Sequence, residues 1–287
     1  MAKILVTGSA GFVGKNIFNF LKNKHKSYGI SRRLSETTTH PYDLNMKDIE
    51  KVLDSINPDI IIHAAALTSV DYCETHQSEA RKSNVSATEN MVNWCKKNNK
   101  KLIYISTDYV YAGLLNNYDE ESSTEPVNLY GKTKLEAELL VQNLKDWCIL
   151  RPTVIYGYDI GGNNFLMQML ALKEKRKIPC DQISNPIDIK VFCEYVSKAI
   201  DINLSGIYVA TGPETINRYE FALLIAKIFE IDKRLLEKTS TVSLNQVAKR
   251  PLNNGTNSSR LRSILSYKSP TIEESLINIK NQVSKAH

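Results

Sequence analysis

KILVTGSAGFVG, residues 3–14, joins a short apolar run to three glycines in the spacing G-x-x-G-x-x-G. The run predicts a strand, and the residues after the glycines have helical periodicity. A turn between a strand and a helix presents unpaired N–H groups, and glycine lets the backbone approach a ligand closely. Such a turn binds the pyrophosphate of a dinucleotide. The residues expected to contact the cofactor here are Gly8, Ala10, Gly11, Phe12, Val13 and Gly14.

The first half of the chain alternates β-branched runs with amphipathic helical stretches, which indicates βαβ units around a mostly parallel sheet. Several runs are apolar on successive residues, as is typical of strands covered on both faces. We therefore expect an α/β fold with a Rossmann-type, doubly wound parallel sheet. The expected strands run from Lys3 to Thr7, Ser27 to Ser31, Ile60 to Ala64, Lys101 to Ser106, Cys148 to Pro152 and Ile207 to Ala210.

The sequence changes character after about Tyr156, where a Gly/Asn loop and several prolines precede helical patterns near residues 217–230 and 271–283. We expect residues 1–155 to form the dinucleotide-binding domain and residues 156–287 to form mostly a smaller, C-terminal substrate-binding lobe. Residues 206–210 are expected to return to the main sheet as a strand. The apolar stripes expected to pack on this sheet are Val13, Ile17, Phe20 and Leu21, and Leu135, Leu139 and Leu140.

Composition excludes several classes of protein. The chain has 287 residues, of which 42% are hydrophobic and 24% charged, so it can bury a sizeable core. Its apolar runs are far shorter than the roughly 20 residues of a membrane span. The first strand begins too early for a signal peptide to precede it, so we expect a cytoplasmic protein without membrane contact. The five cysteines form no C-x-x-C pair, so we expect buried or partly buried thiols and no metal site.

The charge pattern favours a small ligand over a nucleic acid. The net charge is +6, from 37 basic and 31 acidic residues, and the acidic residues are spread along the whole chain. The densest basic stretch, KEKRK at residues 173–177, is expected to be a solvated helix face. A mild positive bias suits a ligand that carries phosphates, so we expect no nucleic-acid partner.

The second expected strand ends in Ser31-Arg32-Arg33. At this point of a dinucleotide-binding unit an acidic residue binds the ribose 2′-hydroxyl of NAD, whereas arginine accommodates the 2′-phosphate of NADP. Two guanidiniums and a hydroxyl can hold a phosphate dianion with charge-assisted hydrogen bonds. We therefore predict that NADP(H) is preferred over NAD(H).

Tyr130 and Lys134 stand four residues apart where a helical pattern begins, so they share one helix face. A phenol has a pKa near 10, and a nearby cation that stabilises the phenolate helps it to transfer a proton near neutral pH. Thr107 follows the fourth expected strand, at the sheet edge where ligands bind in open α/β sheets. Thr107, Tyr130 and Lys134 are therefore the candidate catalytic residues, with Thr107 placed to hydrogen-bond a carbonyl.

These motifs together resemble the extended short-chain dehydrogenase/reductases over most of the chain. They are the glycine loop, HAAA at 63–66, Asn84, STDYVY at 106–111, YGKTK at 130–134 and RP at 151–152. Within that superfamily the chain most resembles the dTDP-4-dehydrorhamnose reductases. The stretches that carry this resemblance are AAALTSVD at 64–71, YGKTKLEAE at 130–138, NF at 164–165, DQ at 181–182 and RPLN at 250–253.

The resemblance implies hydride transfer from NADPH to C4 of a nucleotide-linked 4-keto-6-deoxy sugar, with Tyr130 giving the proton. It also implies that Lys134 binds the nicotinamide ribose and lowers the Tyr130 pKa, and that a homodimer can form. Arg250 is a candidate for the nucleotide diphosphate. The implied cofactor contacts are Asp43, Leu44, Ala64, Ala65, Ala66, Tyr130 and Lys134. The implied substrate contacts are Val70, Asp71, Thr107, Asp108, Tyr109, Asn164 and Arg250.

Two departures from the family pattern bear on the substrate and the cofactor. Val154 stands where the family usually carries a tryptophan near the sugar, and the Arg32-Arg33 pair stands where an acidic residue is frequent. A dehydratase is disfavoured because Asp108 is followed by Tyr109 rather than by glutamate. The alternatives that stay open are a sugar-nucleotide epimerase and a non-catalytic, NADP-binding regulatory subunit like the beta subunit of methionine adenosyltransferase.

Overall fold

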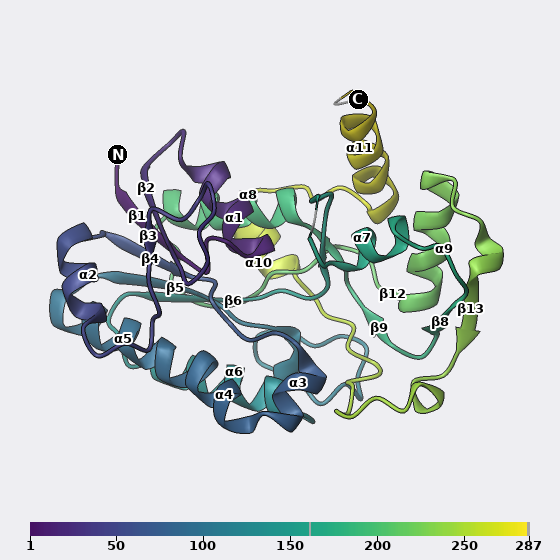
Figure 1. The fold of residues 1–287 in the computed structure, drawn as a ribbon, viewed down its shortest axis with the longest axis horizontal. Coiled ribbons are helices and arrows are strands. Elements are labelled where there is room, and N and C mark those ends of the chain that lie inside the picture. Colours follow the sequence, from purple (N-terminus) through teal and green to yellow (C-terminus); the bar gives the residue numbers. More distant parts are fainter. Residues whose placement is uncertain (161, 286–287) are drawn as a thin grey trace.

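A computed structural model describes residues 1–160 and 162–285 (Figure 1). Its centre is a seven-stranded sheet of order β11-β6-β5-β4-β1-β2-β3, in which every neighbouring pair is parallel. The order reverses between β1 and β4, where ligands bind in open α/β sheets. The strands are β1 (Lys3–Thr7), β2 (Lys26–Ser31), β3 (His40–Pro41), β4 (Ile60–His63), β5 (Lys101–Ile105), β6 (Trp147–Arg151) and β11 (Gly206–Val209).

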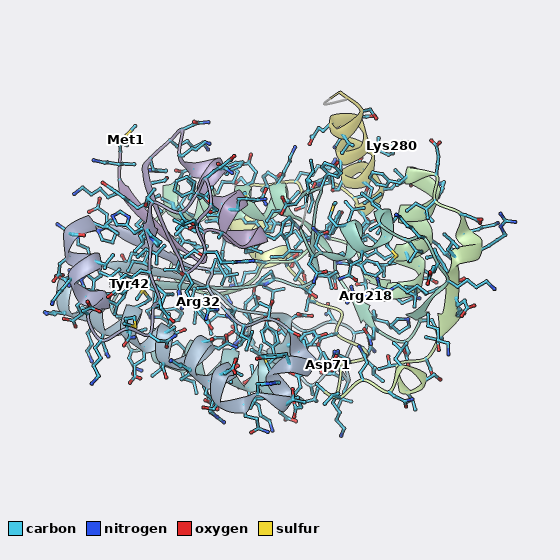
Figure 2. All side chains as sticks on the ribbon, viewed as in Figure 1. Met1, Arg32, Tyr42, Asp71, Arg218 and Lys280 are labelled. Atoms are coloured by element: carbon cyan, nitrogen blue, oxygen red, sulfur yellow. The ribbon has the colours of Figure 1, made fainter. Side chains whose placement is uncertain are left out.

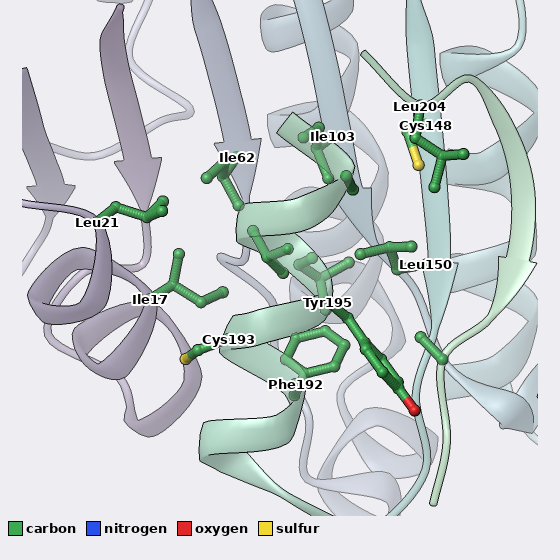
Figure 3. Close-up of a cluster of buried hydrophobic side chains, with 14 of the residues drawn as sticks. Ile17, Leu21, Ile62, Ile103, Cys148, Leu150, Phe192, Cys193, Tyr195 and Leu204 are labelled. Carbon is green, nitrogen blue, oxygen red and sulfur yellow. The ribbon is translucent and has the colours of Figure 1, made fainter. Parts of the chain in front are cut away.

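Helices cover both faces of this sheet, because successive strand residues point to opposite sides. Ile4 and Val6 of β1 join a core with α1 (Phe12–Leu21), α8 (Ile189–Asp201) and α10 (Ser259–Ile264), of which Figure 3 shows a part. Leu5, between them, joins the core on the other face. The helices on that face are α2 (Ile49–Ile56), α5 (Ala87–Asn98) and α6 (Leu129–Val141). The expected doubly wound α/β fold is confirmed.

The segments beyond β6 also build a smaller body with a core of its own, at the right of Figure 1. Its helices are α7 (Phe165–Leu170), α9 (Arg218–Phe229) and α11 (Ile272–Lys285). Phe165 and Phe221 stack there with ring centroids 5.4 Å apart. Its strands are β7 (Ile155–Tyr156), β8 (Arg176–Pro179), β9 (Ile183–Ser184), β10 (Ile187–Asp188), β12 (Ile216–Asn217) and β13 (Leu236–Thr239). Its 3-10 turns are η3 (Lys233–Leu235) and η4 (Val242–Leu244).

Four short helical segments complete the path beside the sheet. They are α3 (Val70–Thr75), α4 (Gln77–Arg81), the π-helix η1 (Lys82–Ser86) and the 3-10 turn η2 (Asp108–Val110). Within the described residues, no helix is both long and apolar enough to cross a membrane. As expected, the five cysteines are free thiols, four of them buried.

Two expectations about surfaces differ from the structure. Leu139 of α6 is 59% exposed, because the buried face of this helix carries Tyr130, Lys134 and Glu138 instead. Leu135 and Leu140 pack against apolar clusters as expected, and Ala137 and Val141 take part in the buried face where Leu139 does not. The basic stretch 173–177 is exposed as expected, but it forms a loop and the start of β8 rather than a helix.

Candidate active site

A cavity of about 320 Å³ lies at the carboxyl ends of β1, β2 and β4, on the β1/β4 reversal of the sheet. Most of its lining was expected from the sequence. Ile30, Tyr42, Asn45, Leu67, Ser83 and Ala87 line it in addition. The expected residues that line it are Gly8, Gly11, Ser31, Arg32, Arg33, Asp43, Leu44, Ala65 and Ala66.

The glycines of the first turn are required by close backbone packing. Gly8 has φ +68°, and a Cβ there would lie 2.8 Å from the Cα of Ala65. A Cβ on Gly14 would lie 2.3 Å from the carbonyl oxygen of Gly8. Helix α1 therefore sits directly on the turn, and no side chain caps its first N–H groups. This bare cradle fits the pyrophosphate of a dinucleotide.

Arginines and an acidic residue form the outer part of this cavity. Arg32 and Arg33 line it together with Ser31 and Tyr42, and Figure 2 labels Arg32 and Tyr42. Asp43 accepts a hydrogen bond from the backbone N–H of Asn45 at 3.0 Å. That bond, with the charge of Arg32 as a weaker contribution, lowers the Asp43 pKa. The side chains present fit a ribose that carries a phosphate, because two guanidiniums face it.

A second cavity, of about 360 Å³, adjoins the first, since Ala66 lines both. It lies between the carboxyl ends of β5 and β6 and the smaller body. The expected residues that line it are Val13, Ala64, Ala66, Val70, Thr107, Asp108, Tyr109, Tyr130 and Lys134. The three candidate catalytic residues thus share one cavity beside the dinucleotide cradle.

Helix α6 positions the phenol and the ammonium. Asn128 caps the helix by accepting a hydrogen bond from the Gly131 N–H at 2.9 Å. Four residues after Tyr130, Lys134 donates from Nζ to the carbonyl oxygen of Ile105 at 2.7 Å, and its Nζ lies 4.1 Å from the centroid of the Tyr104 ring. The buried Lys134 is therefore fixed against β5, just before Thr107.

Burial controls the electrostatics of these groups. It raises the pKa of the Tyr130 phenol, and the neighbouring Thr107 hydroxyl acts in the opposite direction. It also lowers the pKa of Lys134 to about 7, although Glu138 opposes this. In the ligand-free protein burial thus shifts the Tyr130 pKa upward, and the lowering by Lys134 that the resemblance implies stays a prediction. The reason is that both groups are desolvated, which disfavours both charged forms.

Comparisons with known proteins agree with this arrangement. The family model of the RmlD substrate binding domain matches residues 2–284. The chain belongs to this RmlD family. A dTDP-4-dehydrorhamnose reductase of Aggregatibacter actinomycetemcomitans is 29% identical to this RmlD-family chain over 297 residues, which cover 98% of the chain and 99% of that protein.

A solved structure of a dTDP-4-dehydrorhamnose reductase from Bacillus anthracis, in complex with NADP, superposes with a TM-score of 0.89 at 28% identity. It covers 98% of this RmlD-family chain and is itself covered to 99%. Methionine adenosyltransferase 2 subunit beta of Bos taurus is 34% identical, but over 158 residues, 54% of the chain and 47% of that protein. The resemblance inferred from the motifs is confirmed.

Some expected contacts of this RmlD-family chain lie outside both cavities. Asn164 caps α7 and donates from Nδ2 to the carbonyl oxygen of Gly157 at 2.9 Å, so it supports the loop whose Asn163 lines the second cavity. Asp71 and Arg250 pair with each other at 2.7 Å. Ala10, Phe12 and Gly14 also lie outside the two linings. The roles of all six residues as ligand contacts stay predictions.

Asn84 lies in the π-helix η1, a type of irregularity that often marks functional sites. Its Oδ1 accepts from the Leu67 N–H at 2.7 Å, and its Nδ2 donates to the Thr133 hydroxyl at 3.0 Å. Asn84 therefore joins the loop after β4 to the first turn of α6. This cross-link holds Tyr130 and Ala66 in a fixed relation within the RmlD-family site.

Ten residues of the second cavity were not expected as contacts from the sequence, and three of them have side chains that bear on the ligand: Val154, Phe165 and Arg218. Val154, noted only as a departure, lines it with φ +34°, a strained value for a β-branched residue. Phe165 and Arg218 reach it from the starts of α7 and α9. The motif NF at 164–165 was a signal for Phe165, whereas no motif of the sequence pointed to Arg218.

Asp108 is a buried acid beside Thr107. Asn254 donates from Nδ2 to its Oδ2 at 2.7 Å, but burial dominates and raises the Asp108 pKa to about 6 from an ordinary value of 3.8. The pKa of Asp108 is higher in the folded than in the unfolded state. The contribution of the protonated carboxyl to stability is therefore complete below pH 3.8 and is lost as the pH rises through 6.

We therefore expect Asp108→Asn to raise the free energy of unfolding by about 3 kcal/mol at pH 7.5 and by about half of that at pH 5. Urea unfolding at the two pH values measures the difference. The exposed Asp201→Asn is the control, with an expected change below about 0.5 kcal/mol at both. Equal gains for Asp108→Asn at both pH values would contradict the argument.

Proposed function

We propose that this chain reduces the C4 keto group of a nucleotide-linked 4-keto-6-deoxy sugar with NADPH, in the synthesis of a deoxysugar precursor. The observation that carries this proposal is the single cavity that holds Thr107, Tyr130 and Lys134 and adjoins the dinucleotide cradle at Ala66. The family membership and the reductase relatives support it.

Each of the three candidate catalytic side chains has a separate role at the carbonyl group. Thr107, at the end of β5, donates a hydrogen bond that holds the keto oxygen. Tyr130 delivers its proton to the oxygen as negative charge develops there, and Lys134, when protonated, stabilises the phenolate that remains. The bound coenzyme supplies the hydride that reaches the carbonyl carbon.

The residues that would hold the coenzyme follow from the first cavity. The turn from Gly8 to Gly11 and the start of α1 would bind the pyrophosphate, and Ser31, Arg32 and Arg33 would bind the 2′-phosphate. Asp43 and Leu44 would border the adenine, and Ala64 to Ala66 would line the path to the nicotinamide. We propose that the two arginines make NADPH the preferred coenzyme.

Arg32→Ala combined with Arg33→Ala is expected to raise the KM for NADPH by about 10- to 100-fold, because charged hydrogen bonds to the phosphate are lost. The KM for NADH should stay within about threefold, since NADH lacks that phosphate. Steady-state assays with both coenzymes measure the two values. Use of NADH at least as well as NADPH by the unaltered protein would disprove the preference.

A panel of nucleotide-linked keto sugars, assayed by NADPH oxidation, tests the reaction. Turnover with a 4-keto-6-deoxy sugar nucleotide is the expected result. Coenzyme binding without turnover on any panel member would favour the regulatory-subunit alternative. Interconversion of epimers without net consumption of coenzyme would favour an epimerase.

We further propose that the smaller body, with Val154, Phe165 and Arg218 on its side of the cavity, selects the sugar nucleotide. Because Val154 offers no flat stacking surface where the family usually has tryptophan, the preferred sugar or base is expected to differ from that of dTDP-rhamnose synthesis. The same panel, with the base and the sugar configuration varied separately, measures this preference.

A further inference from the structure

Arg218 is the first residue of α9 and reaches the second cavity from the smaller body (Figure 2). Asn217 caps this helix by accepting a hydrogen bond from the Glu220 N–H at 2.9 Å, and the Arg218 N–H donates to the carbonyl oxygen of Gln182 at 2.9 Å. The Arg218 guanidinium lies over the Phe165 ring, 4.6 Å from its centroid. Backbone and ring thus fix the direction of the side chain.

The guanidinium of Arg218 lacks the carboxylate partner that Arg151 and Arg250 have. Arg151 pairs with Glu138 at 2.6 Å and Arg250 pairs with Asp71 at 2.7 Å, whereas in the described part of the chain Arg218 forms no ion pair. Burial lowers its pKa, as do the charges of Arg176 and Arg250, while Tyr109 and Asp108 act in the opposite direction. A partly buried cation in this position destabilises the ligand-free protein unless an anion enters the cavity.

Arg218 and the candidate proton donor lie on different walls of the same cavity. Tyr130 and Thr107 come from α6 and the end of β5, and Arg218 comes from the smaller body. In a hexose ring, C1 stands opposite C4. When C4 is held at Tyr130, the phosphate on C1 therefore points away from Tyr130.

We propose that Arg218 binds the diphosphate that joins the sugar to its nucleoside. This inference rests on the proposed function and names the anion-binding residue of the same site. A guanidinium offers forked donors that match phosphate oxygens, and stacking on Phe165 holds its plane before the ligand arrives. Arg250, the candidate from the sequence, is already paired with Asp71, so its donors are less free.

Arg218→Met tests the proposal, because methionine keeps an unbranched apolar side chain on Phe165 and removes the charge. The probes are dTDP and UDP, titrated calorimetrically into protein saturated with NADP⁺ so that the dinucleotide site is filled. For the nucleotide that the unaltered protein binds, the dissociation constant is expected to rise by about 10- to 100-fold. Coenzyme affinity should stay within about twofold.

Arg176→Met is the matched control, because it removes the same charge from an exposed position of the same body. It should change nucleoside diphosphate affinity by less than about threefold. The thermal midpoint of ligand-free Arg218→Met should be equal to or above that of the unaltered protein, since an unpaired cation is removed. A purely structural arginine would lower it.

Three outcomes would overturn the proposal. The first is an unchanged nucleoside diphosphate affinity in Arg218→Met, and the second is no binding of either nucleotide to the unaltered protein. The third is a thermal midpoint of ligand-free Arg218→Met below that of the unaltered protein. These readouts need no turnover, so absence of reductase activity with intact, Arg218-dependent diphosphate binding would refute the reaction and leave this site standing.

Discussion

Tyr130→Phe is expected to lower kcat by about 10²- to 10⁴-fold, the usual contribution of a positioned proton donor. The ring stays in place, because it packs edge-on against Tyr109 with centroids 5.8 Å apart, but the phenolic oxygen is lost. Without it the oxygen of the reduced sugar has to take its proton from water. Coenzyme affinity should be nearly unchanged, and single-turnover NADPH oxidation measures the chemical step.

Tyr195→Phe provides the matched control for this change. Tyr195 is a buried phenol on α8 that bonds to Ser269, on the other face of the sheet. It should lose some stability and leave kcat unaltered. If Tyr130→Phe kept more than about a tenth of the kcat, the assignment of the proton donor would be wrong.

Arg151→Met is expected to lower the free energy of unfolding by about 3–5 kcal/mol, because it strands a buried carboxylate. The Arg151 and Glu138 side chains are 4% and 0% exposed. Arg151 donates to both Glu138 oxygens and, from Nη1, to the Tyr111 hydroxyl at 3.0 Å. Urea unfolding at pH 7 measures the loss.

Two further variants distinguish the cost of leaving a buried charge without a partner from the cost of breaking an ion pair. Lys97→Met breaks an exposed pair with Glu50 and should cost less than about 1 kcal/mol. Adding Glu138→Leu to Arg151→Met should restore most of the stability, since no charge is then left without a partner. A cost below 1 kcal/mol for Arg151→Met alone would contradict the prediction.

The parts of the fold that the sequence predicts are those governed by local patterns. All six expected strands exist, with ends within one residue of the expected ones. Most of them were predictable because several consecutive apolar residues are typical of a strand that is covered on both faces. The seventh strand of the main sheet, His40–Pro41, has two residues, one of them proline, which is too short for a periodic pattern. The glycine cradle was predictable because its requirement is a backbone requirement at Gly8 and Gly14.

The parts that escaped prediction depend on contacts between distant segments. Arg218 looks like any surface arginine in the sequence, and only the packing of α9 against α7 turns it toward the cavity. No pattern in the sequence predicts that Glu138 is buried, because its partners Ser106 and Arg151 come from two other segments. Pairings of this kind leave no periodic trace along the chain.

The strained backbone of Val154 makes this residue a suitable position for protein engineering. A left-handed backbone beneath a β-branched side chain stores about 1–2 kcal/mol of strain. Glycine or asparagine there would release that strain and widen the cavity in one step. Libraries designed to accept bulkier sugars could therefore start at residue 154, where the released strain offsets part of the packing that a smaller side chain loses.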